Sequence, residues 1–200
     1  LKMLLVELVE AEQSVRFTFG RFHPPHIRHK KLLDAVGKGY IFPSHTYDSK
    51  KNPLMPKEKV GFMRSMFPQH AGNIVYKENA TNIIDIMKLL QKNGHKNVTM
   101  VVGDDRVASF DKLLKSYNGK EYQFNSITVE SAGVRDPDAD GVEGASASKV
   151  RQAAATNDFA TFKSMVPGGN NLAKAIFQAT REGLKVTELA EAEQTKPIVF

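Results

Sequence analysis

Residues 15–36 read VRFTFGRFHPPHIRHKKLLDAV, and this stretch decides the fold. Its opening run, residues 15–19, is rich in β-branched and aromatic side chains, which is typical of a buried strand. Gly20 ends the run, and two adjacent prolines follow, which suit a helix start because a missing N–H costs nothing there. Apolar residues then recur at helical spacing. The stretch therefore predicts a strand, a tight turn and a helix at residues 25–36.

The first turn of this expected helix gathers imidazoles and cations. A helix N-terminus has free N–H groups and a partial positive charge. His26 and His29 are three residues apart and would share one helix face. Arg28, Lys30 and Lys31 add positive charge beside them. This combination predicts a binding place for a polyphosphate.

The same residues carry a family resemblance. GRFHPPHIRH resembles the first signature of the nucleotidyltransferase (cytidylyltransferase-like) superfamily, Gly-x-Phe-x-Pro-x-His/Thr-x-Gly-His, near the nicotinamide-nucleotide adenylyltransferases. FTFGRF is most similar to the phage-encoded branch. The resemblance implies that Gly20 and Phe22 bind nucleotide and that His26 and His29 contact the α-phosphate and the transition state. Arg28 replaces the family's second glycine, and would either crowd the nucleotide or add a phosphate ligand.

A second stretch, residues 103–106, reads GDDR and follows an expected strand. By itself, Gly-Asp after a strand also describes a turn with a helix cap. Beside the first signature, it is similar to the family's Gly-x-Asp, which lies near the nucleoside. The resemblance assigns Gly103 and Asp105 to nucleotide binding, and Arg106 is a candidate phosphate ligand.

A third stretch, residues 143–151, reads EGASASKVR. Ser146 or Ser148 can cap the helix that follows, and that helix start again favours anions. The stretch resembles the family's second signature, Ile-Ser-x-Thr-x-x-Arg, which grips the β- and γ-phosphates. The resemblance therefore assigns Ser146, Ser148 and Arg151 to the leaving pyrophosphate, and it covers residues 15–167.

The implied reaction is transfer of AMP or CMP from a nucleoside triphosphate to a phosphate-bearing acceptor, with release of pyrophosphate. Such a reaction needs no protein nucleophile, only positioning and stabilisation of charge. Mg²⁺ is the implied cofactor, bridging the phosphates and held largely by them. Lys50 and Lys51, in a polar loop, are candidates to hold the acceptor or the triphosphate. Phe110 is a candidate to stack on the acceptor, because the chain has no Trp.

Strands alternate with helices along the chain. This order predicts an α/β, Rossmann-like fold with a mostly parallel, five-stranded sheet and helices on both faces. Ligands in such sheets bind at the carboxyl ends of the strands, near the point where the strand order reverses. The strands are expected at residues 15–19, 40–42, 73–76, 98–102 and 124–129.

The composition of the chain limits which kinds of site and partner it can have. The 200 residues contain no cysteine, so no disulfide or thiolate metal site is available, and the formal net charge is +6. No segment has the length of a membrane span, and we expect no membrane partner. The cytoplasm of a host cell or the inside of a phage particle fits this composition. The positive charge leaves nucleic-acid binding open, although we favour loops that hold anionic substrates.

Two further alternatives concern the histidines and Arg28. His23, His26 and His29 suggest a metal site, but a spacing of three drifts around a helix and two prolines follow His23. A calcium site is a separate alternative for the acidic loop at residues 135–140, but this loop lacks the ligand spacing of an EF-hand. Arg28 also raises the alternative of a catalytically inactive, nucleotide-binding structural protein of a phage particle.

A short segment recurs near the two ends of the chain. ELVEAEQ at residues 7–13 and ELAEAEQ at residues 188–194 differ at one position. This repeat predicts an extension or linker at 1–13, a nucleotidyltransferase-like domain at 14–183, and at 184–200 a linker with the start of a second copy. Both segments also resemble the Leu-x-Glu/Ala sites that prohead proteases of tailed phages cut. A tandem copy or other virion proteins are therefore expected partners.

Overall fold

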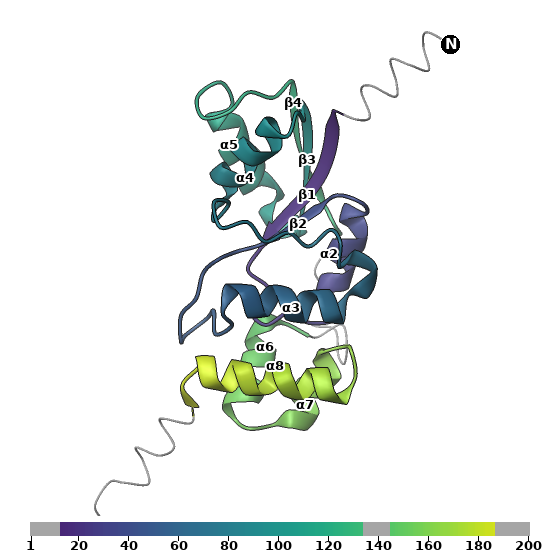
Figure 1. Cartoon of the computed structure of the whole chain (residues 1–200), viewed down its shortest axis with the longest axis vertical. Helices are drawn as coiled ribbons and strands as arrows, with labels where there is room; N and C mark the ends of the chain where they lie inside the picture. Colours follow the sequence, from purple (N-terminus) through teal and green to yellow (C-terminus); the bar gives the residue numbers. More distant parts are fainter. Residues whose placement is uncertain (1–12, 134–144, 187–200) are drawn as a thin grey trace, which may run out of the picture.

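The computed structural model describes residues 13–133 and 145–186. Within them, four parallel strands form one sheet in the order β2-β1-β3-β4 (Figure 1). The strands are β1 (Ser14–Gly20), β2 (Tyr40–Pro43), β3 (Asn97–Val102) and β4 (Ser126–Ser131). The helices are α2 (His29–Val36), α3 (Pro56–Met66), α4 (Ile83–Lys92), α5 (Val107–Tyr117), α6 (Ala147–Ala155), α7 (Phe159–Met165) and α8 (Asn170–Gly183), with short 3₁₀ turns η1 (Pro68–His70) and η2 (Asp104–Arg106). The expected Rossmann-like class is confirmed.

β1 lies at the point where the strand order reverses. It pairs with β2 on one side and with β3 on the other. The next strand in the chain, β2, lies on one side of β1, and the two strands after it, β3 and β4, lie on the other side. The carboxyl ends of β1 and β3 therefore flank a crevice, which is where ligands bind in sheets of this kind.

Helices cover both faces of the sheet. On one face, α2 and α3 bury Leu33, Val36 and Met63. On the other, α4 and α5 bury Leu90 and Leu114 among side chains of β1 and β3. Figure 1 shows α4 and α5 on one side of the strands and α2 on the other. Each helix turns a row of apolar residues, three or four positions apart, toward the sheet.

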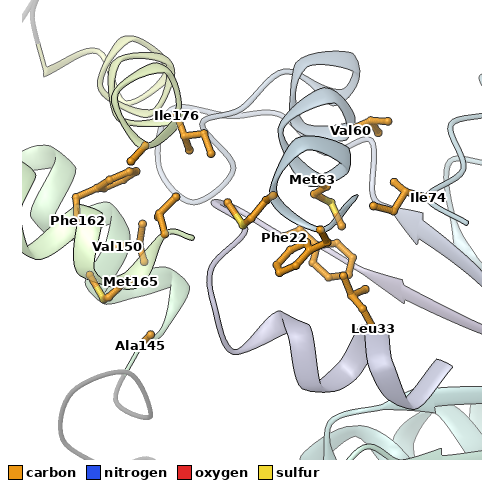
Figure 2. Close-up of a cluster of buried hydrophobic side chains, with 14 of the residues drawn as sticks. Phe22, Leu33, Val60, Met63, Ile74, Ala145, Val150, Phe162, Met165 and Ile176 are labelled. Carbon is orange, nitrogen blue, oxygen red and sulfur yellow. The ribbon is translucent and has the colours of Figure 1, made fainter. Parts of the chain in front are cut away.

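The C-terminal helices α6, α7 and α8 extend the first of these cores. Figure 2 shows Val150, Phe162 and Ile176 in one cluster with Met63 and Phe22. The end of α8 also presses on the loop before α3: a Cβ on Gly183 would lie 1.8 Å from the carbonyl oxygen of Pro53. Only glycine fits there. This contact joins the last helix to the loop that carries Lys50 and Lys51.

The prediction of a fifth strand was wrong. Residues 73–76 form a single bridge, Ile41 to Ile74, flanked by the hydrogen bonds Ile41 N–H to Asn73 O and Val75 N–H to Ile41 O. The next bond of a parallel ladder would need an N–H at Pro43. Proline has none, so pairing on this side of β2 stops after one bridge.

The first helix also begins later than predicted. α2 starts at His29, not at residue 25. His26 precedes the helix in a turn, where its carbonyl accepts from the His29 N–H over 2.9 Å. The N–H of Ile27 donates to the carbonyl of Met165 in α7, so a tertiary contact holds this turn. Asp105, expected to cap α5, instead lies in η2, and α5 begins at Val107.

Several sequence predictions concern residues outside the described parts. The repeated segments at 7–12 and 188–194 and the acidic loop at 135–140 belong to this group. The proposed linkers therefore remain predictions. Among residues 13–133 and 145–186, no helix combines the length and apolar character that crossing a membrane requires.

Candidate active site

A cavity of about 610 Å³ opens at the carboxyl ends of β1 and β3. It brings together residues from all three sequence signatures. Lys50 does not line it, whereas its neighbour Lys51 does. The predicted site residues in its wall are Gly20, Phe22, His26, Arg28, His29, Lys51, Gly103, Asp105, Arg106, Ser146, Ser148 and Arg151.

The charge of this wall favours an anion. Among the described lining residues, Asp105 is the one carboxylate. The cations are Arg21, Arg28, Lys31, Lys51, Arg106 and Arg151. A concave site lined by one sign of charge concentrates ligands of the opposite sign.

Phe22 supports the site from below. Its side chain is buried in the core, as Figure 2 shows, and its ring meets that of His29 edge to face at 4.8 Å. Its backbone has φ of 50°, which is uncommon for a bulky residue. A Cβ on Gly20 would lie 2.9 Å from the Phe22 ring, so a glycine is needed beside it. The Phe22 ring therefore packs against the ring of His29.

The rings of His26 and His29 lie against each other. Their ring centroids are 3.8 Å apart and the rings are tilted by 32°. The backbone N–H of His26 donates to Nδ1 of His29 over 3.0 Å. Because Nδ1 accepts, the proton of a neutral His29 ring is on Nε2. The pair is thus arranged so that His29 can donate a hydrogen bond through Nε2.

Arg28 occupies its non-glycine position without strain. Its φ of −67° and ψ of −20° are right-handed helical values that any residue adopts. Its guanidinium lines the cavity and donates to the carbonyl of Ala145 over 3.3 Å. Arg28 therefore links the start of α2 to the residues that lead into α6.

The start of α6 faces the same cavity. Ser146 caps the helix, its Oγ accepting from the Lys149 N–H over 3.2 Å, as predicted. Arg151 donates to the carbonyl of His23 over 2.8 Å and to Oγ of Ser148 over 3.3 Å. Burial lowers the pKa of Arg151, although a guanidinium stays charged at neutral pH. The third signature is thereby bonded directly to the first.

The residues after β3 lie at the rim. Arg106 Nε is 3.5 Å from the Asp105 carboxylate, and both side chains are more than half exposed. A Cβ on Gly103 would lie 2.9 Å from Asp105 Oδ1, which places backbone and carboxylate close together. Phe110, the candidate for stacking, also lines the cavity and is half-buried.

Asp48 shapes the loop that carries the lysines. Its carboxylate accepts from the backbone N–H of Lys50 over 2.9 Å and of Lys51 over 2.7 Å. The side-chain amide of Asn52 also donates to it. These bonds hold the pKa of Asp48 well below its usual range. The loop is therefore folded around one carboxylate, which directs Lys51 toward the cavity and leaves Lys50 outside it.

Sequence reasoning missed Lys59, which lies directly behind the wall. Its side chain is fully buried, and Nζ is 2.8 Å from the Arg21 carbonyl, 2.6 Å from the Ser44 carbonyl and 2.7 Å from His23 Nε2. Burial lowers the pKa of Lys59 to about 7. A signal existed in the sequence: Lys59 is four residues before Met63, on the apolar face of α3.

His23 faces Lys59 and contacts its Nζ through Nε2. Burial, with Lys59 nearby, lowers the pKa of His23 to about 3. Among residues 13–133 and 145–186, no three His, Asp or Glu side chains are grouped to hold a metal ion. His23 therefore contacts α3, whereas His26 and His29 contact each other.

Comparison with known proteins adds a fold relationship. No family model and no curated protein matches the sequence. Among solved structures, the chain is similar to a candidate nicotinate-nucleotide adenylyltransferase from Vibrio parahaemolyticus, with a TM-score of 0.55 and 12% identity. The match covers 82% of this chain and 98% of that one. The two proteins share a fold over most of their lengths.

Proposed function

We propose that this protein is a nucleotidyltransferase that transfers AMP or CMP from a nucleoside triphosphate to a phosphate-bearing acceptor. An oxygen of the acceptor phosphate forms a bond to the α-phosphorus. The bond from that phosphorus to the bridging oxygen of the β-phosphate breaks, and pyrophosphate leaves with the electron pair. No covalent protein intermediate is required.

One observation carries the proposal. The His26–His29 pair and the capped start of α6 line one cationic cavity, and Arg151 bonds to His23 across 128 residues of sequence. A single histidine pair or a single helix start is common in proteins. Their meeting at the carboxyl ends of β1 and β3, with one carboxylate among the described lining residues, suits a triphosphate.

Each lining residue is proposed to contact a different part of the two substrates. His29, donating from Nε2, suits the α-phosphate oxygens, on which charge changes during transfer. Ser146, Ser148 and Arg151 suit the β- and γ-phosphates that leave. Lys51 suits the acceptor phosphate or the triphosphate, and Asp105 the nucleoside.

Mg²⁺ belongs to the substrate in this proposal. Bound to the triphosphate, it neutralises charge on the phosphate oxygens. Asp105 is the one carboxylate that the described cavity wall offers as a further ligand. We therefore expect phosphate and water oxygens to supply most of the coordination.

The acceptor is proposed by analogy with the fold neighbour. Because that protein is described as a nicotinate-nucleotide adenylyltransferase, nicotinate mononucleotide is the first acceptor to test and nicotinamide mononucleotide the second. Phe110 is available in the cavity to stack on either ring. This specificity is proposed separately from the reaction class.

A pyrophosphate-release screen tests the function. The four nucleoside triphosphates are combined with nicotinate mononucleotide, nicotinamide mononucleotide, pantetheine phosphate and phosphocholine, with Mg²⁺ present. We expect release that needs both substrates and that falls roughly 10²-fold in His29→Ala. Triphosphate binding without release by any pair would favour the alternative, an inactive nucleotide-binding structural protein. Absence of triphosphate binding would contradict both functions.

The phage setting is a proposal from the sequence alone. It rests on the FTFGRF form of the first signature and on the recurring acidic segments. A second, tandem domain and virion partners are part of the same proposal. Mass spectrometry of the natural protein tests it: an intact chain that starts at its own Met and stops at Phe200 would contradict both tandem organisation and processing.

A further inference from the structure

We propose that Lys59 is a positioning residue that holds the loop of residues 21–23 from behind and contributes its positive charge to the cavity when a polyphosphate is bound. The charge-linked part rests on the proposed function. The positioning part rests on contacts that exist without a nucleotide. Lys59 itself does not line the cavity, so it would act through the backbone and through His23.

The loop is held from two sides. From α3, Lys59 Nζ donates to the Arg21 carbonyl and contacts the His23 ring, and it also reaches the Ser44 carbonyl just after β2. From α6, Arg151 donates to the His23 carbonyl over 2.8 Å. Two basic side chains on separate helices thereby fix the backbone that leads into His26.

Hydrogen-bond geometry permits two states of the buried pair. An ammonium has three donors, and Lys59 has three partners: two carbonyls and His23 Nε2. When Lys59 is neutral, it can accept from a proton on Nε2, while His23 Nδ1 accepts from the Leu54 N–H at 3.4 Å. The states differ by one proton and by the tautomer of His23, and neither leaves Lys59 without a partner.

Burial of Lys59 favours the neutral state of the pair until an anion arrives. None of the ion pairs within residues 13–133 and 145–186 includes Lys59. Arg151 of α6 disfavours a positive His23, whereas Asp48 of the loop after β2 favours it. Lys59 in turn disfavours a positive His45. A polyphosphate in the cavity would supply the missing counter-charge and so favour the ammonium form.

Linkage then predicts a pH dependence of binding. Because burial lowers the pKa of free Lys59 to about 7, most of it is neutral at pH 8.5. A ligand that binds the charged form more tightly must take up a proton there, and its affinity must fall as pH rises. Phosphate monoesters have a second pKa near 6, so the triphosphate itself changes little in charge above pH 7.5.

The experiment compares Lys59→Met with Arg64→Met. Methionine has similar volume and no charge. Arg64 is the matched control, because it is on the same helix and donates to the Ile74 carbonyl over 2.7 Å, outside the cavity wall. Calorimetry with MgATP, MgCTP and inorganic pyrophosphate is run at pH 7.5 and 9.0, in two buffers of different ionisation enthalpy. Nitrogen NMR of the His23 ring is recorded without ligand from pH 6 to pH 9.

We expect parent affinity for the triphosphate to fall about tenfold between pH 7.5 and 9.0, with proton uptake on binding. Lys59→Met binds about tenfold more weakly at pH 7.5 and shows neither effect, whereas Arg64→Met behaves as the parent. The His23 ring of the parent changes tautomer near pH 7, and that of Lys59→Met does not.

Three results would each overturn a part of the proposal about Lys59. A His23 spectrum constant from pH 6 to pH 9 in the parent overturns the Lys59–His23 coupling, whatever the enzyme does. Parent-like affinity and turnover in Lys59→Met overturn the positioning role. A His23 transition without any triphosphate binding overturns the proposed function and the charge-linked part, and supports the coupling. If Lys59→Met does not fold, the pH series on the parent still decides.

Discussion

The backbone N–H of His26 donates a 3.0 Å hydrogen bond to Nδ1 of His29, and this bond selects the nitrogen with which His29 can donate. The two residues meet because the chain turns before α2 begins at His29. Their ring centroids are then 3.8 Å apart, and the Phe22 ring meets the His29 ring edge to face. A backbone group thus sets the tautomer of a side chain that lines the cavity.

This relationship predicts the effects of two His29 variants. Asn mimics the Nδ1 acceptor and can keep the bond from His26, but it lacks the Nε2 donor. We expect His29→Asn and His29→Ala both to lower turnover by roughly 10²-fold, with little change in triphosphate affinity, because the lost bond strengthens in the transition state. Steady-state rates and calorimetry measure the two effects. Parent-like turnover in His29→Asn would remove the assignment of Nε2.

Arg28→Gly should weaken triphosphate binding, not restore it. The Arg28 backbone is unstrained and its guanidinium lines the cavity beside the Ala145 carbonyl. Loss of one charge-assisted contact costs about 1.5–3 kcal/mol, or roughly 10- to 100-fold in affinity. Titration calorimetry with MgATP checks this. Tighter binding in the glycine variant would mean that Arg28 blocks the nucleotide.

Gly20→Ala should lower turnover by disturbing the contact between Phe22 and His29. The new methyl group would lie 2.9 Å from the Phe22 ring, which must then move relative to His29. Gly61→Ala is the control, because Gly61 is exposed within α3 and a Cβ there meets nothing within 4 Å. We expect Gly61→Ala to raise stability by about 0.5–1 kcal/mol with unchanged turnover. Denaturant unfolding and rate assays on both variants separate the effects.

Ser146 serves as a cap and lies in the cavity, and two substitutions separate these roles. Ser146→Ala removes the acceptor for the Lys149 N–H and should cost about 1 kcal/mol of stability. Ser146→Asp restores the cap but brings a negative charge to the phosphates. We expect parent-like thermal stability in Ser146→Asp with at least tenfold weaker pyrophosphate binding. Equal binding by Ser146→Asp and the parent would exclude Ser146 from the phosphate site.

The buried His23 should make the protein less stable in mild acid. Its folded-state pKa is lowered to about 3, whereas an unfolded histidine takes up a proton near pH 6.5. The unfolded state therefore gains protons first as pH falls, and we expect the free energy of unfolding to drop by about 2 kcal/mol between pH 6.5 and 5. His23→Leu should flatten this slope. Burial also lowers the pKa of His45 and His95, so these two histidines further reduce the free energy of unfolding as pH falls.

The local elements could be read from the sequence. The β-branched and aromatic run of β1 and the apolar spacing of α4 each identify an element within a few residues. Ser146 could be assigned as a cap because capping involves residues only three apart. The three signatures could also be assigned to one end of the sheet, because consecutive parallel strands end at the same edge.

Tertiary contacts decided the rest. The N–H of Ile27 bonds to Met165 of α7, which keeps His26 outside the helix that its spacing predicted. Pro43 limits the pairing of β2 with residues 73–76 to a single bridge. This effect depends on which segment lies beside β2, and that is a tertiary property. Lys59 lies fully buried against His23 because α3 packs beside β2 and brings Nζ to the carbonyls of Arg21 and Ser44. Sequence patterns report interactions over one or two helical turns, whereas burial and long-range hydrogen bonds depend on which elements pack together, and only the folded chain determines that.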